Sequence, residues 1–91
     1  IRPNEAKAHY GLANALASEG RSEESIAHYL ESIRLEPHNA DVHTNLGNAL
    51  FQRGKVKEAV THYEEALRLS PSSASARDNM KLAIQQMETH H

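Results

Sequence analysis

The sequence contains no cysteine and no tryptophan, and aromatic side chains make up only 4% of its 91 residues. Without a thiol, the chain forms no disulfide, no thiolate metal site and no cysteine nucleophile. No apolar run approaches the roughly 18–20 residues of a membrane-spanning helix. Neither sign of charge prevails, since 10 Lys and Arg stand against 12 Asp and Glu, for a formal net charge of −2. We therefore expect neither nucleic-acid binding nor direct membrane insertion.

The sequence does contain an internal repeat with a step of 34 residues. Residues 6–39 align with residues 40–73 without a gap, at 14 identities in 34 positions. Chance would give about two or three identities, so the two units are duplicates. A third copy begins at Ala74 and stops near Glu88, after one helix's worth of residues.

The repeat divides the chain into units of unequal completeness. The chain begins with Ile1 in place of an initiator methionine, and we interpret it as a piece of a longer protein. The expected segments are 1–5 as the tail of a preceding repeat, 6–39 as the first unit, 40–73 as the second unit, 74–88 as a terminal helix or the start of a third unit, and 89–91 as a disordered end or tag remnant that contains His90 and His91.

Each unit is predicted to form two helices, because apolar residues recur at the 3.6-residue spacing of one helical face. Gly20 and Gly54 follow the first helices, where a left-handed residue ends a helix at low cost. Pro37 and Pro71 stop the second helices, since proline lacks the backbone N–H that a helix needs. Side-chain caps are expected from Ser22, Asn39 and Ser73. The five expected helices span residues 6–18, 22–35, 40–52, 56–69 and 74–88.

The core is predicted where the apolar faces of these helices meet. Leu12, Ala13 and Leu16, together with His9, form the expected inner face of the first helix, and the second unit repeats this face. Tyr63 is expected to be buried between the first helix of its own unit and the terminal helix.

A 34-residue unit of two helices with these landmarks resembles the tetratricopeptide repeat (TPR) family. The small, aromatic and terminal proline positions of that family are occupied here by Ala13, Ser25, Tyr29, Pro37, Gly47, Ala59, Tyr63 and Pro71. Four positions depart from the common residues: His9 and His43 replace tryptophan, and Ser25 and Ser32 replace alanine. The resemblance implies an all-α fold, a right-handed α-solenoid of antiparallel helix pairs whose first helices line a concave groove. It does not imply an activity.

If the chain forms such a solenoid, the side of its first helices and terminal helix that faces the groove is rich in amide and hydroxyl side chains. Asparagine offers both a donor and an acceptor, which suits the main chain of an extended peptide. We expect alanine at Asn14 and Asn48 to weaken peptide binding while leaving the melting temperature nearly unchanged. The alternative is that these polar residues only solvate an exposed face. The candidate peptide-binding residues are Lys7, Tyr10, Asn14, Asp41, Thr44, Asn45, Asn48, Phe51, Gln52 and Asn79.

Catalytic and metal sites are not expected, because the candidate residues have the wrong spacing. His9 with His43, and His28 with His62, are equivalent residues of successive units. Such residues lie about 10 Å apart, too far to share one ion with bonds of about 2 Å. Adjacent carboxylates, as in Glu23-Glu24, point about 100° apart on a helix and form no acid–base pair. We therefore predict that the chain is not an enzyme and has no cofactor and no metal site.

Two comparisons within the family refine the expected partner. TPR domains that bind the C-terminal carboxylates of heat-shock chaperones use two asparagines and three cationic residues. The asparagine sites match Asn14 and Asn45, but Tyr10, Ser75 and Asn79 occupy the cationic sites. Without charge-assisted bonds, each worth about 1.5–3 kcal/mol, a chaperone C-terminal carboxylate is not the expected ligand. Asn45 and Asn79 are also similar to the asparagine ladder of the O-GlcNAc transferase, although the first unit breaks that ladder.

The sequence thus favours a non-catalytic protein-interaction module or scaffold that binds an extended segment of a protein or peptide partner. We expect a cytoplasmic location. Two alternatives stay open. The chain is a structural spacer or self-association element that forms a homo-oligomer through open repeat ends, or it is the docking tail of a TPR-containing glycosyltransferase.

Overall fold

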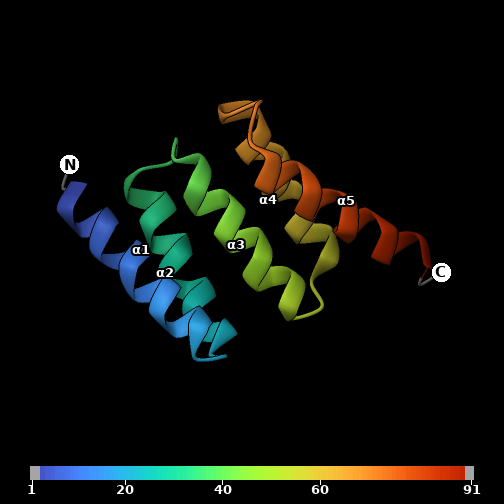
Figure 1. Cartoon of the computed structure of the whole chain (residues 1–91). Helices are drawn as coiled ribbons and strands as arrows, with labels where there is room; N and C mark the ends of the chain where they lie inside the picture. Colours follow the sequence, from blue (N-terminus) through green and yellow to red (C-terminus); the bar gives the residue numbers. More distant parts are fainter. Residues whose placement is uncertain (1–2, 90–91) are drawn as a thin grey trace.

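Five α-helices account for most of residues 3–89, the part of the chain that this computed structural model describes (Figure 1). No strand occurs within this part. The all-α prediction and the count of five helices are therefore confirmed. The helices are α1 (Pro3–Ser18), α2 (Ser22–Leu35), α3 (Ala40–Gln52), α4 (Val56–Leu69) and α5 (Ala74–Thr89).

The first and last helices are longer than predicted from the sequence. Helix α1 begins at Pro3, so residues 3–5 belong to this helix instead of forming a separate tail. Proline is favoured at a first helical position, where its missing N–H has no intrahelical partner to lose. Helix α5 continues to Thr89, one residue beyond the expected end. The predictions for residues 1–2 and for His90 and His91 concern residues outside the described part of the chain.

The turn between the two helices of each unit contains a glycine with a left-handed backbone. Gly20 has φ of +80° and Gly54 has φ of +78°. Each glycine sits in a Schellman motif, in which the next residue's N–H returns to the helix. Arg21 N–H donates to Leu16 O at 2.9 Å, and Lys55 N–H donates to Leu50 O at 2.9 Å. The prediction that these glycines end the first helices is confirmed.

Side-chain caps hold the starts of α3 and α5, but not the start of α2. Asn39 Oδ1 accepts from the N–H of Asp41 at 3.0 Å, and Ser73 Oγ accepts from the N–H of Ala76 at 3.2 Å. The expected cap at Ser22 is wrong. Ser22 is already the first residue of α2, because the preceding Schellman turn leaves only one residue before the helix starts. Its hydroxyl donates to Gln52 Oε1 at 3.2 Å instead.

The helices form two layers, with α1, α3 and α5 in one and α2 and α4 in the other (Figure 1). The core lies between the layers. Tyr63 is 1% exposed, and a Cβ atom at Gly47 would lie 2.6 Å from its ring. This close approach explains the glycine, and it confirms the expected burial of Tyr63. The core cluster consists of Ala13, Tyr29, Val42, Leu46, Ala49, Leu50, Ala59, Tyr63 and Ala83.

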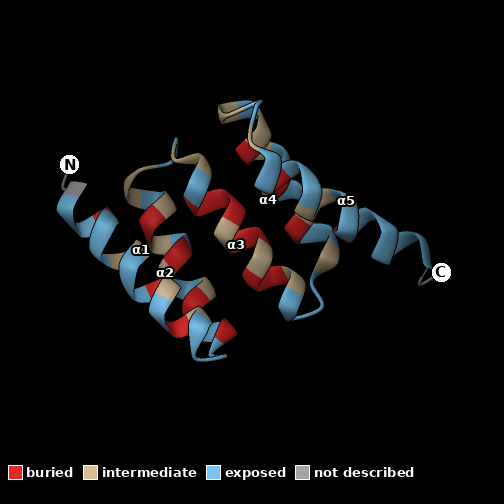
Figure 2. Ribbon diagram, in the orientation of Figure 1, coloured by how far each residue is buried: buried red, intermediate tan, exposed pale blue. Residues whose placement is uncertain are grey.

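Burial is strongest along α3, as Figure 2 shows. Helix α3 contacts each of the other four helices, whereas α1 contacts only α2 and α3 among them. Leu46 on α3 is consequently fully buried, while its equivalent Leu12 on α1 is 47% exposed. The expectation that Leu12 belongs to the inner face of α1 is wrong for this reason. The described helices include none that is both long enough and apolar enough to span a membrane.

Candidate functional site

Two adjoining hollows open on the layer formed by α1, α3 and α5, each with a volume of about 320 Å³. They share Asn48 and Gln52, so we treat them as one groove. The residues that line the groove are Asn14, Ala17, Ser18, Tyr29, Asn45, Asn48, Ala49, Phe51, Gln52, Tyr63, Asn79 and Leu82. None of these side chains is charged.

Hydrogen bonds join the floor of the groove across the helices. In the first unit, Asn14 Oδ1 on α1 accepts from the hydroxyl of Tyr29 on α2 and from Nδ2 of Asn45 on α3, the latter at 3.1 Å. Asn45 Nδ2 also donates to the hydroxyl oxygen of Tyr10 at 3.0 Å. These contacts tie both helices of the first unit to the first helix of the second.

The same arrangement recurs 34 residues later in the chain. Asn48 Oδ1 on α3 accepts from the hydroxyl of Tyr63 on α4 at 2.5 Å and from Nδ2 of Asn79 on α5 at 2.9 Å. We call each set, Asn14–Tyr29–Asn45 and Asn48–Tyr63–Asn79, an Asn–Tyr–Asn relay. Its repetition shows that the polar residues of the groove also connect successive units.

Both tyrosines of the relays act as neutral donors. Burial raises the pKa of Tyr63 to about 12. Burial, and then the nearby Tyr10, raise the pKa of Tyr29 to about 12. Each hydroxyl therefore keeps its proton at neutral pH and directs it toward an asparagine oxygen.

Each relay leaves unused hydrogen-bonding groups. The carbonyl oxygens of Asn14 and Asn48 are occupied, but among the described residues no partner binds their Nδ2 groups. The opposite holds for Asn45 and Asn79, whose Nδ2 groups donate and whose Oδ1 atoms have no partner among those residues. Amide donors and acceptors thus alternate along the groove from one asparagine to the next.

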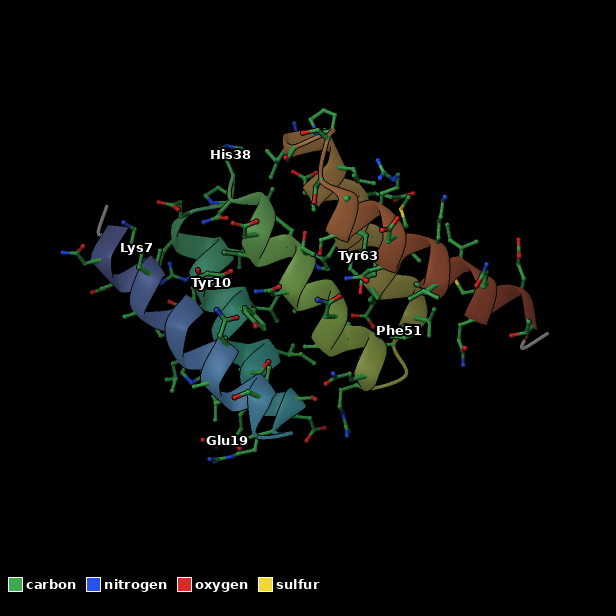
Figure 3. All side chains as sticks on the ribbon, in the orientation of Figure 1. Lys7, Tyr10, Glu19, His38, Phe51 and Tyr63 are labelled. Carbon is green, nitrogen blue, oxygen red and sulfur yellow. The ribbon has the colours of Figure 1, made fainter. Side chains whose placement is uncertain are left out.

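The structure brings together most of the candidate residues. Six of them line the groove: Asn14, Asn45, Asn48, Phe51, Gln52 and Asn79. Tyr10 joins them through its bond to Asn45 (Figure 3).

Three candidate residues do not line the groove. Lys7, near the start of α1 in Figure 3, and Asp41, in the first turn of α3, are exposed outside it. Thr44 is only 6% exposed, and its hydroxyl donates to Ala40 O on its own helix at 3.0 Å. The side chain of Thr44 therefore has its hydroxyl occupied within α3.

The two asparagines have partners within the free protein, since the carbonyl oxygen of each of Asn14 and Asn48 accepts from a buried tyrosine. The expectation that alanine at these positions leaves the melting temperature nearly unchanged takes no account of these bonds. Tyr29 and Tyr63 are not among the candidate residues predicted from the sequence, because both belong to the core stripe of the second helices. The constant separation of 15 residues between each tyrosine and its asparagine is the available sequence signal.

Comparison with known protein families gives a clear match. The sequence model described as "Tetratricopeptide repeat" matches residues 2–39 and 10–74. The chain belongs to the tetratricopeptide repeat family. TPR units are protein-interaction modules, so the comparison supports a role in binding other proteins.

Solved structures of TPR proteins share the fold of this chain. One is the second TPR of Spaghetti (RPAP3) bound to the HSP90 peptide SRMEEVD, with a TM-score of 0.92 and 23% identity over 96% of this chain and 81% of that chain. Another is the APC/C hetero-tetramer Cut9-Hcn1, with a TM-score of 0.86 and 25% identity over 89% of this chain but only 16% of that chain. No curated protein matches the sequence.

Proposed function

We propose that this TPR segment is a non-catalytic module that binds an extended peptide segment of a protein partner in its groove. The observation that carries the proposal is the alternation of unused amide donors and acceptors at Asn14, Asn45, Asn48 and Asn79. An extended peptide presents N–H and C=O groups along its length and matches such a surface without needing a particular sequence. A cytoplasmic location is part of the same proposal.

The groove also offers an apolar contact at one end. Phe51 is half-buried and Leu82 is 57% exposed, and both line the hollow next to Asn79. An exposed leucine beside an aromatic ring suits an apolar side chain of the ligand, because burying apolar surface is worth about 25 cal/mol per Å². The asparagine amides would then hydrogen-bond to the main chain of the ligand, and Phe51 and Leu82 would contact one of its apolar side chains.

The groove does not suit a chaperone C-terminal carboxylate. The similar RPAP3 structure is bound to an HSP90 peptide, but likeness at this level of identity concerns the fold alone. Here the residues lining the groove carry no charge. The hydroxyl oxygen of Tyr10 accepts from Asn45, and Nδ2 of Asn79 donates to Asn48, so neither residue supplies a cation. A terminal carboxylate would leave water without gaining a cationic partner, which costs several kcal/mol in a buried setting.

The test selects binders from a phage-displayed library of short random peptides against the whole chain and measures their affinity by fluorescence anisotropy. Ala17→Glu and Leu82→Glu add charge to the groove without removing a residue of either relay. The matched control is Leu30→Glu, at a 48% exposed leucine on α2, in the other layer. We expect both groove variants to bind at least tenfold more weakly and the control to bind like the wild type. Equal binding by all four proteins contradicts the proposal.

A second arm tests the chemistry of the ligand. Each selected peptide is compared as the free C-terminal acid and as the C-terminal amide. We expect the two forms to bind with affinities within about twofold, since no cation in the groove rewards a carboxylate. A strong preference for the free acid would assign the groove to carboxylate recognition instead.

A further inference from the structure

In each unit, one pair of histidines joins the two helices. Neither pair belongs to the residues that line the groove. His9 Nδ1 on α1 lies 3.0 Å from His28 Nδ1 on α2, and His43 Nδ1 on α3 lies 3.1 Å from His62 Nδ1 on α4. The rings of each pair are stacked, with interplanar angles of 24° and 22°. Histidines of different units are too far apart to share one ion, but the two histidines of each pair belong to the same unit and lie in contact.

Hydrogen bonding assigns the proton of one ring. His43 Nε2 lies 3.0 Å from the carbonyl oxygen of Pro37. A carbonyl only accepts, so the proton of the neutral His43 ring is on Nε2 and its Nδ1 has a free lone pair. Metal-binding histidines characteristically donate the N–H of the second ring nitrogen to a backbone carbonyl in this way. The lone pair of His43 Nδ1 faces His62.

Two carboxylates near the pair formed by His43 and His62 attract a cation. Glu58 and Glu65 both interact electrostatically with the His62 ring. A neutral imidazole is the form that binds a metal. His62 is half-buried, so exchange with water can move its proton from Nδ1 to Nε2 and free the first nitrogen as well. The carboxylates supply negative charge next to the pair.

The distance between the nitrogens fits two adjacent ligands of one metal ion. With bonds of about 2.0–2.1 Å, nitrogens separated by 3.0–3.1 Å subtend an angle of about 91–102° at the metal. This range lies between the right angle of a tetragonal site and the tetrahedral angle, and the affinity of nitrogen ligands for divalent ions rises through Ni²⁺ to Cu²⁺. Among the described residues, no group of three or more His, Asp or Glu converges to hold an ion, so water fills the other positions.

We propose that each unit carries a two-histidine site for a divalent late transition metal ion, Cu²⁺ or Ni²⁺, one formed by His9 and His28 and the other by His43 and His62. The bound ion replaces the contact between the two nitrogens and links the two helices of the unit. This proposal concerns residues that do not line the groove, so it is independent of peptide binding.

The test titrates NiCl₂ into the full chain by isothermal calorimetry. His90→Ala and His91→Ala are introduced first, because adjacent terminal histidines compete for the metal. We expect two equivalents of Ni²⁺ on this background, one equivalent after His62→Gln, and none after His28→Gln with His62→Gln. The control is His38→Gln, at an exposed histidine outside the pairs, which should keep two equivalents. No binding on the background protein, or an unchanged stoichiometry in the double variant, means that the pairs are hydrogen bonds only and overturns the proposal.

Spectroscopy and melting supply independent readouts. Electron paramagnetic resonance of the Cu²⁺-loaded protein should show hyperfine coupling to two equatorial nitrogens per ion. Ni²⁺ should raise the melting temperature by several degrees, because a ligand that binds only the folded state stabilises it, and the double variant should lose this rise. Circular dichroism verifies the fold of each variant. If His62→Gln does not fold, His28→Gln gives the same stoichiometric readout for the other site.

Discussion

At the scale of single residues, two serines of α2 occupy positions where the family usually has alanine, and their surroundings differ. Ser25 is 0% exposed and Ser32 is 2% exposed. Ser32 Oγ donates to Ala6 O at 2.9 Å, whereas Ser25 Oγ has no hydrogen-bond partner within the described part of the chain. A buried hydroxyl without a partner costs free energy, while a bonded one contributes to stability.

Ser25→Ala should therefore raise the free energy of unfolding by about 1 kcal/mol, because it removes an unpaired buried hydroxyl and keeps the packing. Ser32→Ala is the matched control, and it should lower the free energy of unfolding by about 1 kcal/mol because it removes a bond between α1 and α2. Urea titration measures both variants. Destabilisation of the same size in both would show that Ser25 has a partner after all.

Asn48→Ala should lower the free energy of unfolding by about 1–3 kcal/mol, because the buried hydroxyl of Tyr63 loses its acceptor. This outcome replaces the sequence-based expectation of an unchanged melting temperature. The same substitution in a Tyr63→Phe background should cost less, since no hydroxyl then needs an acceptor. Denaturant titrations of the two single variants and the double variant measure the coupling. Additive costs would show that the relay does not contribute to stability.

The relay tyrosines also predict a loss of stability at alkaline pH. Tyr29 and Tyr63 ionise near pH 10 when unfolded and near pH 12 when folded. Between these values the folded state holds more protons than the unfolded state, so the free energy of unfolding falls as pH rises. We expect a loss of about 1 kcal/mol per tyrosine by pH 11, measured by urea titration at pH 8 and pH 11. Tyr63→Phe should remove about half of this dependence, and equal stability at both values of pH would contradict the assignment.

At the scale of the helix, the two kinds of junction use different chemistry. Within a unit, a left-handed glycine and its Schellman bonds turn the chain, and the next helix starts at Ser22 or Val56 without a side-chain cap. Between units, the turn contains a proline, and Asn39 or Ser73 caps the next helix. The cap therefore stabilises the junctions that join one unit to the next.

Asn39→Ala should lower the free energy of unfolding by about 1 kcal/mol, because two N–H groups at the start of α3 lose their acceptor. His38→Ala, at the exposed neighbouring residue, is the control and should change stability by less than about 0.5 kcal/mol. Thermal melts followed by circular dichroism measure both. A cap contribution would be ruled out if the two variants melted together.

The sequence predicts these helices well because their ends depend on local chemistry. Gly20, Gly54 and Asn39 act within a few residues of their own position. The 34-residue step also places a helix-ending glycine and a capping residue in both units. The sequence predicts less about Leu12, whose exposure depends on how many helices lie beside α1. The same holds for the relay, because the partner of Asn14 depends on where α2 places the hydroxyl of Tyr29.

At the scale of the whole molecule, large apolar side chains remain exposed on the helices at either side of the solenoid. Leu12 on α1 and Leu30 on α2 are 47% and 48% exposed. On α5, Ile84 and Met87 are each 37% exposed, and Leu82 is exposed in the groove. A solenoid unit buries its apolar face against its neighbours, so these surfaces favour contact with another copy or with further repeats.

We expect the isolated chain to associate reversibly at high concentration through these surfaces. Sedimentation equilibrium from micromolar to millimolar protein should show the mass rising above 10.1 kDa. Leu30→Glu with Met87→Glu should restore a monomer, because a charge buried in the contact has no partner. The control is Thr61→Glu, at an exposed position of α4, which should leave association unchanged. A constant monomer mass for the wild type across that range rules association out.

The Asn–Tyr–Asn relay sets a rule for how such a chain can lengthen during evolution. Each relay takes its first asparagine and its tyrosine from one unit and its last asparagine from the next, at a fixed separation of 31 residues between the asparagines. A tandem duplication of the second unit therefore preserves both relays and adds a third without any compensating substitution, whereas a copy of the first unit would place Gly11 where the relay needs an asparagine. An insertion of any other length inside a first helix rotates the asparagines out of phase. The relay therefore favours lengthening by whole copies of the second unit, which keep the asparagines in phase.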